Sequence, residues 1–407
     1  MPASFVHLDA DAFFASVEQA ADRRLRGRPV AVGGRRRGII ACASYEARAR
    51  GVYTPMPSAE ALRICPDLVL LPGHFSLYEE FSANIFGLCE EITPLVEKTS
   101  IDEGYLDLSP TRWGSAPQGI REMNRLQEEI QQWMKITVSQ GLAGNKLVSQ
   151  IASKLHKPRG FVVVPPGREA TFLRPLPLHH LPGLGPQTIA RLQDGGFFRI
   201  EDLLAVPPQT LQPLLGSRTE AVRQMARGED DRRLLPERPA AQSLSQQESY
   251  ETDQGDEAYI LRRAKHLLSR LLTRLRESQQ QARTLHLQIR YTDRETAVRS
   301  LSLEEPTNLP EDFHPRLPAL LKSCWSRRVR VRTLCLRLSN FYRFTVQQNL
   351  WPEKRDRRQT LARAVDAINR TYGPQTIRRA YEITDTETTP QPGARNTSAH
   401  QRSGNRP

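Results

Sequence analysis

The sequence predicts a multidomain α+β protein, and three features of the chain support that fold class. At 407 residues, the chain has room for two to four domains of about 100–200 residues each. In residues 4–165, short strand patterns and helix patterns alternate without a strict βαβ order. Residues 245–345 follow a different and complete order, β-α-β-β-α-β, which is the split βαβ motif.

The first region opens with a strand and a helix. Residues 4–9 alternate apolar and polar side chains and end in acids, and residues 13–21 predict a helix. Further strands are expected at 29–32, 39–44, 95–100, 104–108 and 136–139, and further helices at 45–50, 56–63, 75–93, 120–133 and 145–155.

The middle of the chain is predicted to form small helices. Pro165-Pro166-Gly167 marks a boundary, and short helices follow up to residue 232. Among them, Gly183 and Gly185 form a Gly-x-Gly turn between two helices, which can present backbone N–H groups to one DNA phosphate. An ordinary helix-hairpin turn is the alternative. Residues 232–247 have few apolar side chains and two prolines, which indicates a tether.

The last region supplies the split βαβ pattern. Strands are expected near 248–251 and at 283–291, 296–303 and 330–338, with helices at 257–277 and 313–325. The alternation in the second strand predicts one packed sheet face and one polar, basic face that can lie along a phosphate backbone. Arg290 and Arg337 are the candidate DNA contacts on that face. A solvated sheet face without a partner is the alternative.

Composition favours a nucleic-acid partner. The chain has 58 Lys and Arg against 45 Asp and Glu, a formal net charge of +13, and most of its cations are arginines, which suit bidentate phosphate contact. An inert basic surface is the alternative. Five cysteines without a CxxC pair indicate core residues in a reducing cytosol. Without an apolar run of about 18 residues or a signal-peptide pattern, we expect no membrane segment and a cytoplasmic, nucleoid-associated protein.

The acidic residues suggest a metal site. A short apolar strand pattern places Asp102 and Glu103 side by side, where adjacent carboxylates need a compensating cation. Asp9 lies at the end of the first strand pattern. We expect the two strands to be neighbours and to hold divalent metal for phosphoryl transfer, since Mg²⁺ prefers oxygen ligands. Asp11 and Asp107 are alternatives that lie further from the shared centre, and any one acid alone is more often a surface residue or a cap.

Other residues suit a triphosphate and a sugar. Tyr45 and Arg48 are one helical turn apart, so a hydroxyl and a guanidinium can reach one phosphate, and Lys157 is a third candidate. Taken alone, Arg48 is more simply a solvated helix residue. Of the Phe13-Phe14 pair, one ring is expected in the core and the other could lie under the sugar, although aromatic residues after a strand are usually core.

These residues belong to motifs that follow one another in a fixed order along the chain. The motifs are His7–Glu18, Ala43–Arg48, Ser100–Asp107, Asn145-Lys146 with Ile151–Pro158, and Leu181–Pro186. Together, over roughly residues 4–345, they resemble the Y-family translesion DNA polymerases, closest to the DNA polymerase IV type. The resemblance implies template-directed addition of dNTPs to a primer 3′ end, error-prone bypass of damaged bases and no proofreading.

The resemblance also implies a right-hand polymerase architecture. Its parts are a palm (1–12 and 79–166), fingers (13–78), a helical thumb with a helix-hairpin-helix (167–232), a linker (233–244) and a β-α-β-β-α-β little finger (245–345). Two Mg²⁺ ions are implied, held by Asp9, Asp102 and Glu103 with help from the backbone carbonyl of Ala10. Asp102 is then expected to hold both ions with Asp9, while Glu103 lies nearer the primer 3′-hydroxyl.

For the nucleotide, the resemblance assigns the remaining candidates. Tyr45, Arg48 and Lys157 match the residues that contact the triphosphate. Phe14 matches the steric gate that rejects ribose, and Phe13 is then the ring packed behind it.

Residues 346–385 are expected to hold a clamp-binding peptide and a helix. Gln347, Leu350 and Trp351 have the spacing of the peptide by which related bacterial polymerases dock on the sliding clamp. Residues 386–407 are predicted to be a disordered tail. The expected partners are primer-template DNA, dNTP and the clamp, and the protein is expected to be a monomer.

Two other classes of function remain open from the sequence. One is a catalytically silent accessory protein that binds DNA and clamp; it would bind primer-template without metal-dependent extension. The other is a nucleotidyl cyclase or related enzyme that uses the same acids and turns over NTP without DNA. Inactive relatives have lost the metal acids, whereas this chain keeps Asp9, Asp102 and Glu103, which favours the polymerase.

Overall fold

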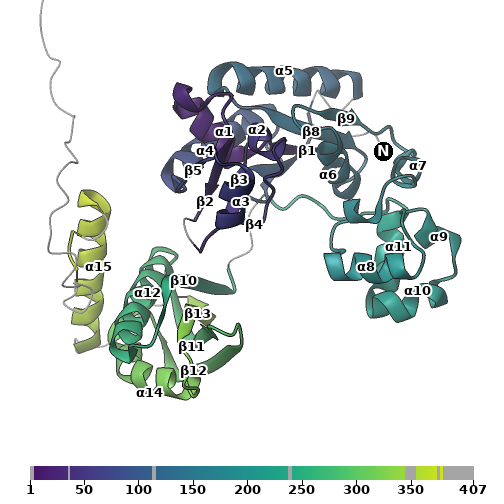
Figure 1. The fold of residues 1–407 in the computed structure, drawn as a ribbon. Helices are drawn as coiled ribbons and strands as arrows, with labels where there is room; N and C mark the ends of the chain where they lie inside the picture. Colours follow the sequence, from purple (N-terminus) through teal and green to yellow (C-terminus); the bar gives the residue numbers. More distant parts are fainter. Residues whose placement is uncertain are drawn as a thin grey trace, which may run out of the picture. The chain divides into compact units, whose positions relative to one another are not determined.

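The computed structural model describes residues 4–34, 37–111, 116–236, 241–343, 354–373 and 376–378. The chain divides into two compact units, residues 1–239 and residues 240–407 (Figure 1). The first unit contains two β-sheets and a group of short helices, and the second contains one four-stranded sheet with helices packed on it. Each unit has its own apolar core.

A five-stranded sheet forms the centre of the first unit. Its strand order is β6-β7-β1-β8-β9, with bounds Val96–Lys98, Glu103–Asp107, Phe5–Ala10, Val138–Ala143 and Phe161–Val163. β1 pairs antiparallel with β7 on one side and with β8 on the other, and its alternate residues face opposite sides of the sheet. The prediction that the two acid-bearing strands are neighbours is confirmed.

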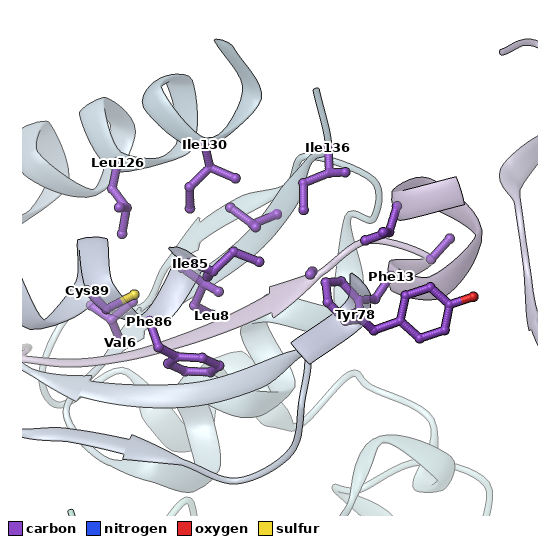
Figure 2. Packing of buried hydrophobic residues seen from close by; sticks show 14 of the residues in the cluster. Val6, Leu8, Phe13, Tyr78, Ile85, Phe86, Cys89, Leu126, Ile130 and Ile136 are labelled. Carbon is purple, nitrogen blue, oxygen red and sulfur yellow. The ribbon is translucent and has the colours of Figure 1, made fainter. Parts of the chain in front are cut away.

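One face of this sheet is apolar. Val6 and Leu8 of β1 belong to a core cluster with side chains of α4 (Phe75–Ile92) and α5 (Ala116–Met134), as Figure 2 shows. Gly104 of β7 is required at this contact, because a β-carbon there would lie 2.6 Å from the Phe86 ring. This face therefore holds the sheet mainly by burial of apolar surface, and Gln140 of β8 adds a buried hydrogen bond to the Met123 carbonyl oxygen of α5 (3.0 Å).

The opposite face of the sheet is covered by α6 (Lys146–Leu155) at very short range. α6 begins after Asn145, whose side chain accepts a hydrogen bond from the Val148 amide (3.0 Å). Gly141 of β8 allows the close approach, because a β-carbon there would lie 2.6 Å from the amide nitrogen of Ser153. The helix is thus held directly over the polar side chains of β1 and β7.

A smaller sheet lies beside α1 (Phe13–Ala21), which contacts both this sheet and α4. Its strand order is β4-β3-β2-β5, with bounds Met56–Pro57, Ile39–Ala43, Val30–Gly33 and Val69–Leu71. The helices α2 (Tyr45–Arg48) and α3 (Ser58–Ile64) follow strands of this sheet. The chain passes from β1 into α1 through Ala12, which has the left-handed backbone angle φ 45°.

Short helices complete the first unit and share a core with the outer side of α6. They are α7 (Glu169–Leu173), α8 (Pro186–Asp194), α9 (Asp202–Ala205), α10 (Pro208–Leu215) and α11 (Thr219–Ala226). Leu192 and Leu211 pack in one cluster with Leu147 and Ile151 of α6. α6 is therefore sandwiched between the sheet and these helices, which explains why most of its residues are buried.

The chain leaving these helices is fastened to the sheet and α6. Lys146 forms a buried ion pair with Glu97 (2.6 Å), and the same carboxylate oxygen of Glu97 accepts a hydrogen bond from the Leu235 amide (2.7 Å). Asp230 accepts another from the Leu147 amide (2.8 Å). The predicted tether therefore does not begin at residue 232, because specific contacts hold the backbone as far as Leu235.

The second unit has the predicted β-α-β-β-α-β order. Its main elements are β10 (Ser243–Gln254), α12 (Glu257–Glu277), β11 (Gln280–Tyr291), β12 (Thr296–Thr307), α13 (Pro310–Phe313), α14 (Leu317–Cys324) and β13 (Val331–Arg343). The strands lie in the order β10-β13-β11-β12. The last described helix, α15 (Lys354–Tyr372), is joined to α12 by the ion pair between Asp366 and Arg276 (2.6 Å).

Several predicted boundaries are wrong, each for a local reason. The strand expected at 136–139 lies at Val138–Ala143, because its glycine and polar residues suit a central strand with a helix pressed against it. The helix expected from residue 56 begins at Ser58, since Met56 pairs with Ile40. The short strands β5 and β9 were not predicted. In the described part of the chain, no helix has the length and apolar character needed to cross a membrane.

The close approach of α6 predicts the effect of a glycine substitution. Gly141→Ala should lower the free energy of unfolding by about 1–3 kcal/mol, because the added methyl group must displace α6 or β8. Urea unfolding of the intact protein measures this change. The matched control is Gly87→Ala in α4, where a β-carbon meets no atom within 4 Å and where alanine should stabilise the helix by about 0.5–1 kcal/mol. Equal stability of the two variants would contradict the packing described.

Candidate active site

The antiparallel pairing of β1 with β7 brings two of the predicted acids together. Asp9 is the residue opposite Glu103, and His7 is opposite Tyr105. The Ala10 amide donates to the carbonyl oxygen of Asp102 (2.9 Å), which extends the pairing beyond the end of β7. Asp9 and Glu103 therefore lie at the same end of the sheet and on the same face, and Asp102 directly precedes Glu103 in the chain.

A serine holds the turn that carries Asp102. Ser100 Oγ accepts hydrogen bonds from the amides of Asp102 (3.1 Å) and Glu103 (3.0 Å), and it also contacts the carboxylate of Asp102. This arrangement satisfies backbone donors in the turn between β6 and β7 that have no strand partner. The Ser100 contacts thus set where both carboxylates leave the backbone.

Lysines from α6 and the segment after it compensate these acids. Lys157 forms an ion pair with Asp9, and Lys154 Nζ lies 3.4 Å from Glu103 Oε2. Burial raises the pKa of Asp9 above its ordinary value, Lys157 opposes that increase, and the nearby Glu103 carboxylate adds to it. The Asp9 carboxylate therefore depends on the neighbouring Lys157 cation to stay ionised.

A buried histidine lies beneath the acids and was not selected from the sequence. His7 Nδ1 is 2.7 Å from Ser153 Oγ, and His7 Nε2 is 3.7 Å from Glu103 Oε2. Burial, reinforced by nearby lysines, lowers the pKa of His7 to about 3, so the ring is neutral. The signal in the sequence was the alternation: His7 and Asp9 are two residues apart on a strand and so share a face.

The oxygen atoms at this end of the sheet are of the kind that binds a divalent cation. Within the described ranges, no three His, Cys, Asp or Glu side chains lie together as a ready metal site. Carboxylate and carbonyl oxygens at adjacent strand ends are nevertheless the ligands that Mg²⁺ prefers, and Mg²⁺ keeps several waters of its own. Lys154 and Lys157 place positive charge beside Glu103 and Asp9, so these carboxylates pair with cations in this structure.

The two alternative acids have structural roles. The Asp11 carboxylate is fully buried and accepts hydrogen bonds from Thr137 (2.8 Å), Ser139 (2.8 Å) and the Arg159 amide (2.8 Å). Asp107 lies opposite Phe5 at the far end of β7, where it accepts from the Ser109 amide (2.8 Å). Asp11 therefore ties three segments together, and Asp107 is separated from Asp9 by the length of the strand pair.

Tyr45 and Arg48 lie beside each other on α2, and Tyr45 contacts Asp11. The Tyr45 hydroxyl is 3.5 Å from Asp11 Oδ1, and burial, followed by the charge of Asp11, raises its pKa. The Arg48 guanidinium lies over the Tyr45 ring (4.9 Å) and donates to the Ala43 carbonyl oxygen (2.9 Å). One turn of α2 thus places a neutral hydroxyl and a fixed positive charge beside each other.

The two phenylalanines take different positions. Phe13 is 2% exposed and belongs to the sheet core, whereas Phe14 is only partly buried. The Phe14 ring stacks on Tyr78, with centroids 4.5 Å apart and an interplanar angle of 21°. Tyr78 in turn donates to Glu18 Oε1 (2.5 Å). The Phe14 ring therefore rests on a fixed aromatic support while the residue stays partly exposed.

The Gly-x-Gly turn immediately precedes α8. Gly183 has a φ of +81°, which favours glycine, and Gly185 is the cap residue before the helix. The carbonyl oxygen of Gly183 accepts a hydrogen bond from Arg218 (3.1 Å). The turn therefore presents the backbone at the helix N-terminus with an arginine alongside.

Arg290 and Arg337 lie on the outer face of the sheet in the second unit. Both are exposed, on the adjacent strands β11 and β13. Their neighbours on that face are mainly hydroxyl and amide residues, with His286 opposite Arg337. The face is therefore polar with a few basic residues, in line with the polar, basic face expected from the sequence.

The clamp-peptide residues Gln347, Leu350 and Trp351 lie outside the described residues. Their assignment stays a prediction from the sequence.

Comparison with protein families matches both units of the chain. Residues 8–154 match the impB/mucB/samB family, and residues 241–380 match the C-terminal domain of the same family. The first match contains every predicted metal-site residue, and the second contains the split βαβ unit.

Individual relatives cover nearly the whole chain. The chain is 44% identical over 381 residues to DNA polymerase IV of Opitutus terrae, covering 93% of this chain and 97% of the relative. It is 38% identical to DNA polymerase IV of Alkalilimnicola ehrlichii, covering 84% and 96%.

Among solved structures, the fold is similar to a chimera of the Y-family DNA polymerases Dbh and Dpo4. The TM-score is 0.75 at 25% identity, covering 83% of this chain and 99% of the chimera. An insertion ternary complex of Dbh DNA polymerase is also similar, with a TM-score of 0.58 at 25% identity and the same coverage.

Proposed function

The chain belongs to the impB/mucB/samB family and is a Y-family DNA polymerase of the DNA polymerase IV type, and we propose which of its residues carry out the reaction. It adds deoxynucleotides to a primer 3′ end under the direction of a template, including damaged templates, and it is error-prone. The observation that supports our assignment best is the strand register that places Asp9 opposite Glu103 with Asp102 adjacent.

We assign the metal site to Asp9, Asp102, Glu103 and the backbone carbonyl of Ala10. Family membership implies dependence on divalent metal, and two bound Mg²⁺ ions would activate the primer hydroxyl and stabilise charge on the triphosphate. The protein's own contribution is to hold three carboxylates at one sheet end, with Lys157 paired to Asp9 and Lys154 beside Glu103 until metal and nucleotide bind.

We assign the triphosphate to Tyr45, Arg48 and Lys157. An incoming nucleotide offers Lys157 phosphate oxygens in place of its ion pair with Asp9, which leaves the Asp9 carboxylate available to metal. Arg48 is already oriented by its hydrogen bond to Ala43, so little side-chain entropy is lost when it binds phosphate.

We assign sugar selection to Phe14. Its ring is supported from behind by Tyr78, so a ribose 2′-hydroxyl would meet a surface that cannot move aside. Phe13 packs in the core and sets the position of Phe14 through the first turn of α1.

For DNA, we propose contacts from two surfaces. Gly183 and Gly185 would bind a phosphate at the N-terminus of α8. Arg290 and Arg337 would lie along a phosphate backbone on the outer sheet face, where hydroxyl side chains add uncharged donors. We further propose that residues 347–351 bind the sliding clamp, that the enzyme acts as a monomer, and that it works beside the nucleoid in the cytoplasm.

A catalytically silent accessory role is not favoured. The relatives that match the chain are named as DNA polymerase IV, and the three acids that a silent relative could lose are present.

Loss of a metal ligand should abolish most activity. Asp102→Asn is expected to slow primer extension at least about a hundredfold, because a lost ligand removes several kcal/mol of transition-state stabilisation. Single-nucleotide insertion with Mg²⁺ and dNTP measures this. The matched control is Asp107→Asn, which changes an acid at the other end of the strand pair and should keep nearly full activity. Equal rates for the two variants would contradict the site.

Removal of the Phe14 ring should relax sugar selection. We expect Phe14→Ala to raise the ratio of rNTP to dNTP incorporation by about tenfold or more, since one steric contact is worth 10–200-fold in discrimination. Phe75→Ala is the control, because Phe75 contacts the Phe14 ring edge-on but is 61% exposed. If Phe75→Ala changed sugar selection as strongly as Phe14→Ala, Phe14 would not be the gate.

The clamp peptide can be tested separately from catalysis. Leu350→Ala combined with Trp351→Ala should weaken binding to an immobilised sliding clamp by about thirtyfold, the effect of losing buried anchor residues. Primer extension without clamp should not change. The control Asn349→Ala alters a position between Gln347 and Leu350 that the assigned pattern leaves open, and it should bind like wild type. Unchanged binding of the double variant would refute the assignment.

A further inference from the structure

His7 is a buried polar residue that the proposed mechanism does not use. It has no exposed surface, and its Nε2 atom has no hydrogen-bond partner among the described residues. The ring packs edge-on against Tyr105 (4.6 Å) and lies beneath α6. A core histidine needs its polar atoms satisfied, because an unpaired buried group costs about 1–3 kcal/mol.

The surroundings of His7 favour one of its two neutral tautomers. Ser153 Oγ lies 2.7 Å from Nδ1 and 2.8 Å from the Gln150 carbonyl oxygen, so its hydrogen can be donated to either acceptor. On the other side of the ring, Glu103 Oε2 is 3.7 Å from Nε2. If Nε2 carried a lone pair, that lone pair would face a carboxylate. A proton on Nε2 faces the carboxylate favourably and leaves Nδ1 to accept from Ser153.

We propose that His7 is a positioning residue for Glu103, with Nε2–H directed at Oε2 of that carboxylate and Nδ1 accepting a hydrogen bond from Ser153. A shift of less than about 1 Å in the Glu103 side chain brings the pair to hydrogen-bond distance. Lys154 contacts the same oxygen but is 44% exposed on a flexible stem. The rigid ring, held by Ser153, therefore selects the Glu103 rotamer, and the lysine supplies charge.

This proposal rests on the assignment of Glu103 to the metal site. A fixed Glu103 rotamer keeps the other carboxylate oxygen, Oε1, pointing in one direction. The loss of His7 should therefore lower kcat more than it changes the binding of substrate. Residues that orient a metal ligand in this way typically contribute ten- to hundredfold to affinity or activity.

Two nearly isosteric variants test the hydrogen bond. Glutamine places its amide nitrogen near the position of Nε2, whereas asparagine, one methylene shorter, reaches only the position of Nδ1. We expect His7→Asn to lower kcat for single-nucleotide insertion by about tenfold or more, with KM for dNTP and the Kd for primer-template unchanged. His7→Gln should restore kcat to within about threefold of wild type. Equal kcat for the two variants would overturn the proposal.

A second measurement needs no activity and works on the wild-type protein. Histidine-selective ¹⁵N labelling and NMR report which ring nitrogen carries the proton, with the His7 signal identified by its loss in His7→Gln. We expect the Nε2–H tautomer in wild type and a change in its population or shift in Glu103→Ala. The Nδ1–H tautomer in wild type would overturn the proposal even if the variants were unstable.

The outcomes separate this proposal from the proposed function. If Asp102→Asn and Asp107→Asn are equally active, the metal site itself is wrong. If Asp102→Asn is inactive while His7→Asn equals His7→Gln, only the role of His7 fails.

Discussion

The antiparallel register between β1 and β7 is the constraint on which the rest of the site depends. It sets Asp9 opposite Glu103 and joins Ala10 to Asp102, so three carboxylates leave the backbone within one end of one sheet. Such a concentration of negative charge in a partly buried place is unstable without cations. The lysines beside Asp9 and Glu103 are therefore a consequence of this one pairing.

Side chains of β1 alternate between an apolar face and a polar face of the sheet. Val6 and Leu8 anchor the strand in an apolar core, while His7 and Asp9 face α6. Because Gly141 lets α6 approach within backbone contact, the polar groups on this face meet directly and without intervening bulk. Burial on one side thus supplies the rigidity that catalytic geometry on the other side requires.

The residues proposed to bind the nucleotide are also held by neighbouring protein groups. Phe14 is supported by Tyr78, and Tyr78 is held by Glu18, so the ring proposed to select the sugar is backed by a residue that is itself hydrogen-bonded. Lys157 and Arg48 are likewise held in place by protein groups before any substrate arrives. A site built from groups already in position loses little entropy on binding.

The sequence by itself determined the α+β class, the split βαβ unit and the family resemblance, and it singled out Asp9, Asp102 and Glu103 as candidate metal ligands, because each depends on local periodicity or on motifs read along the chain. It did not determine the true extent of β8, whose glycine and polar residues resemble a loop until α6 is placed on it. Only the tertiary structure decided which groups meet across the sheet. His7 contacts Ser153 across 146 residues and Lys157 contacts Asp9 across 148, separations over which sequence spacing carries no information about contact.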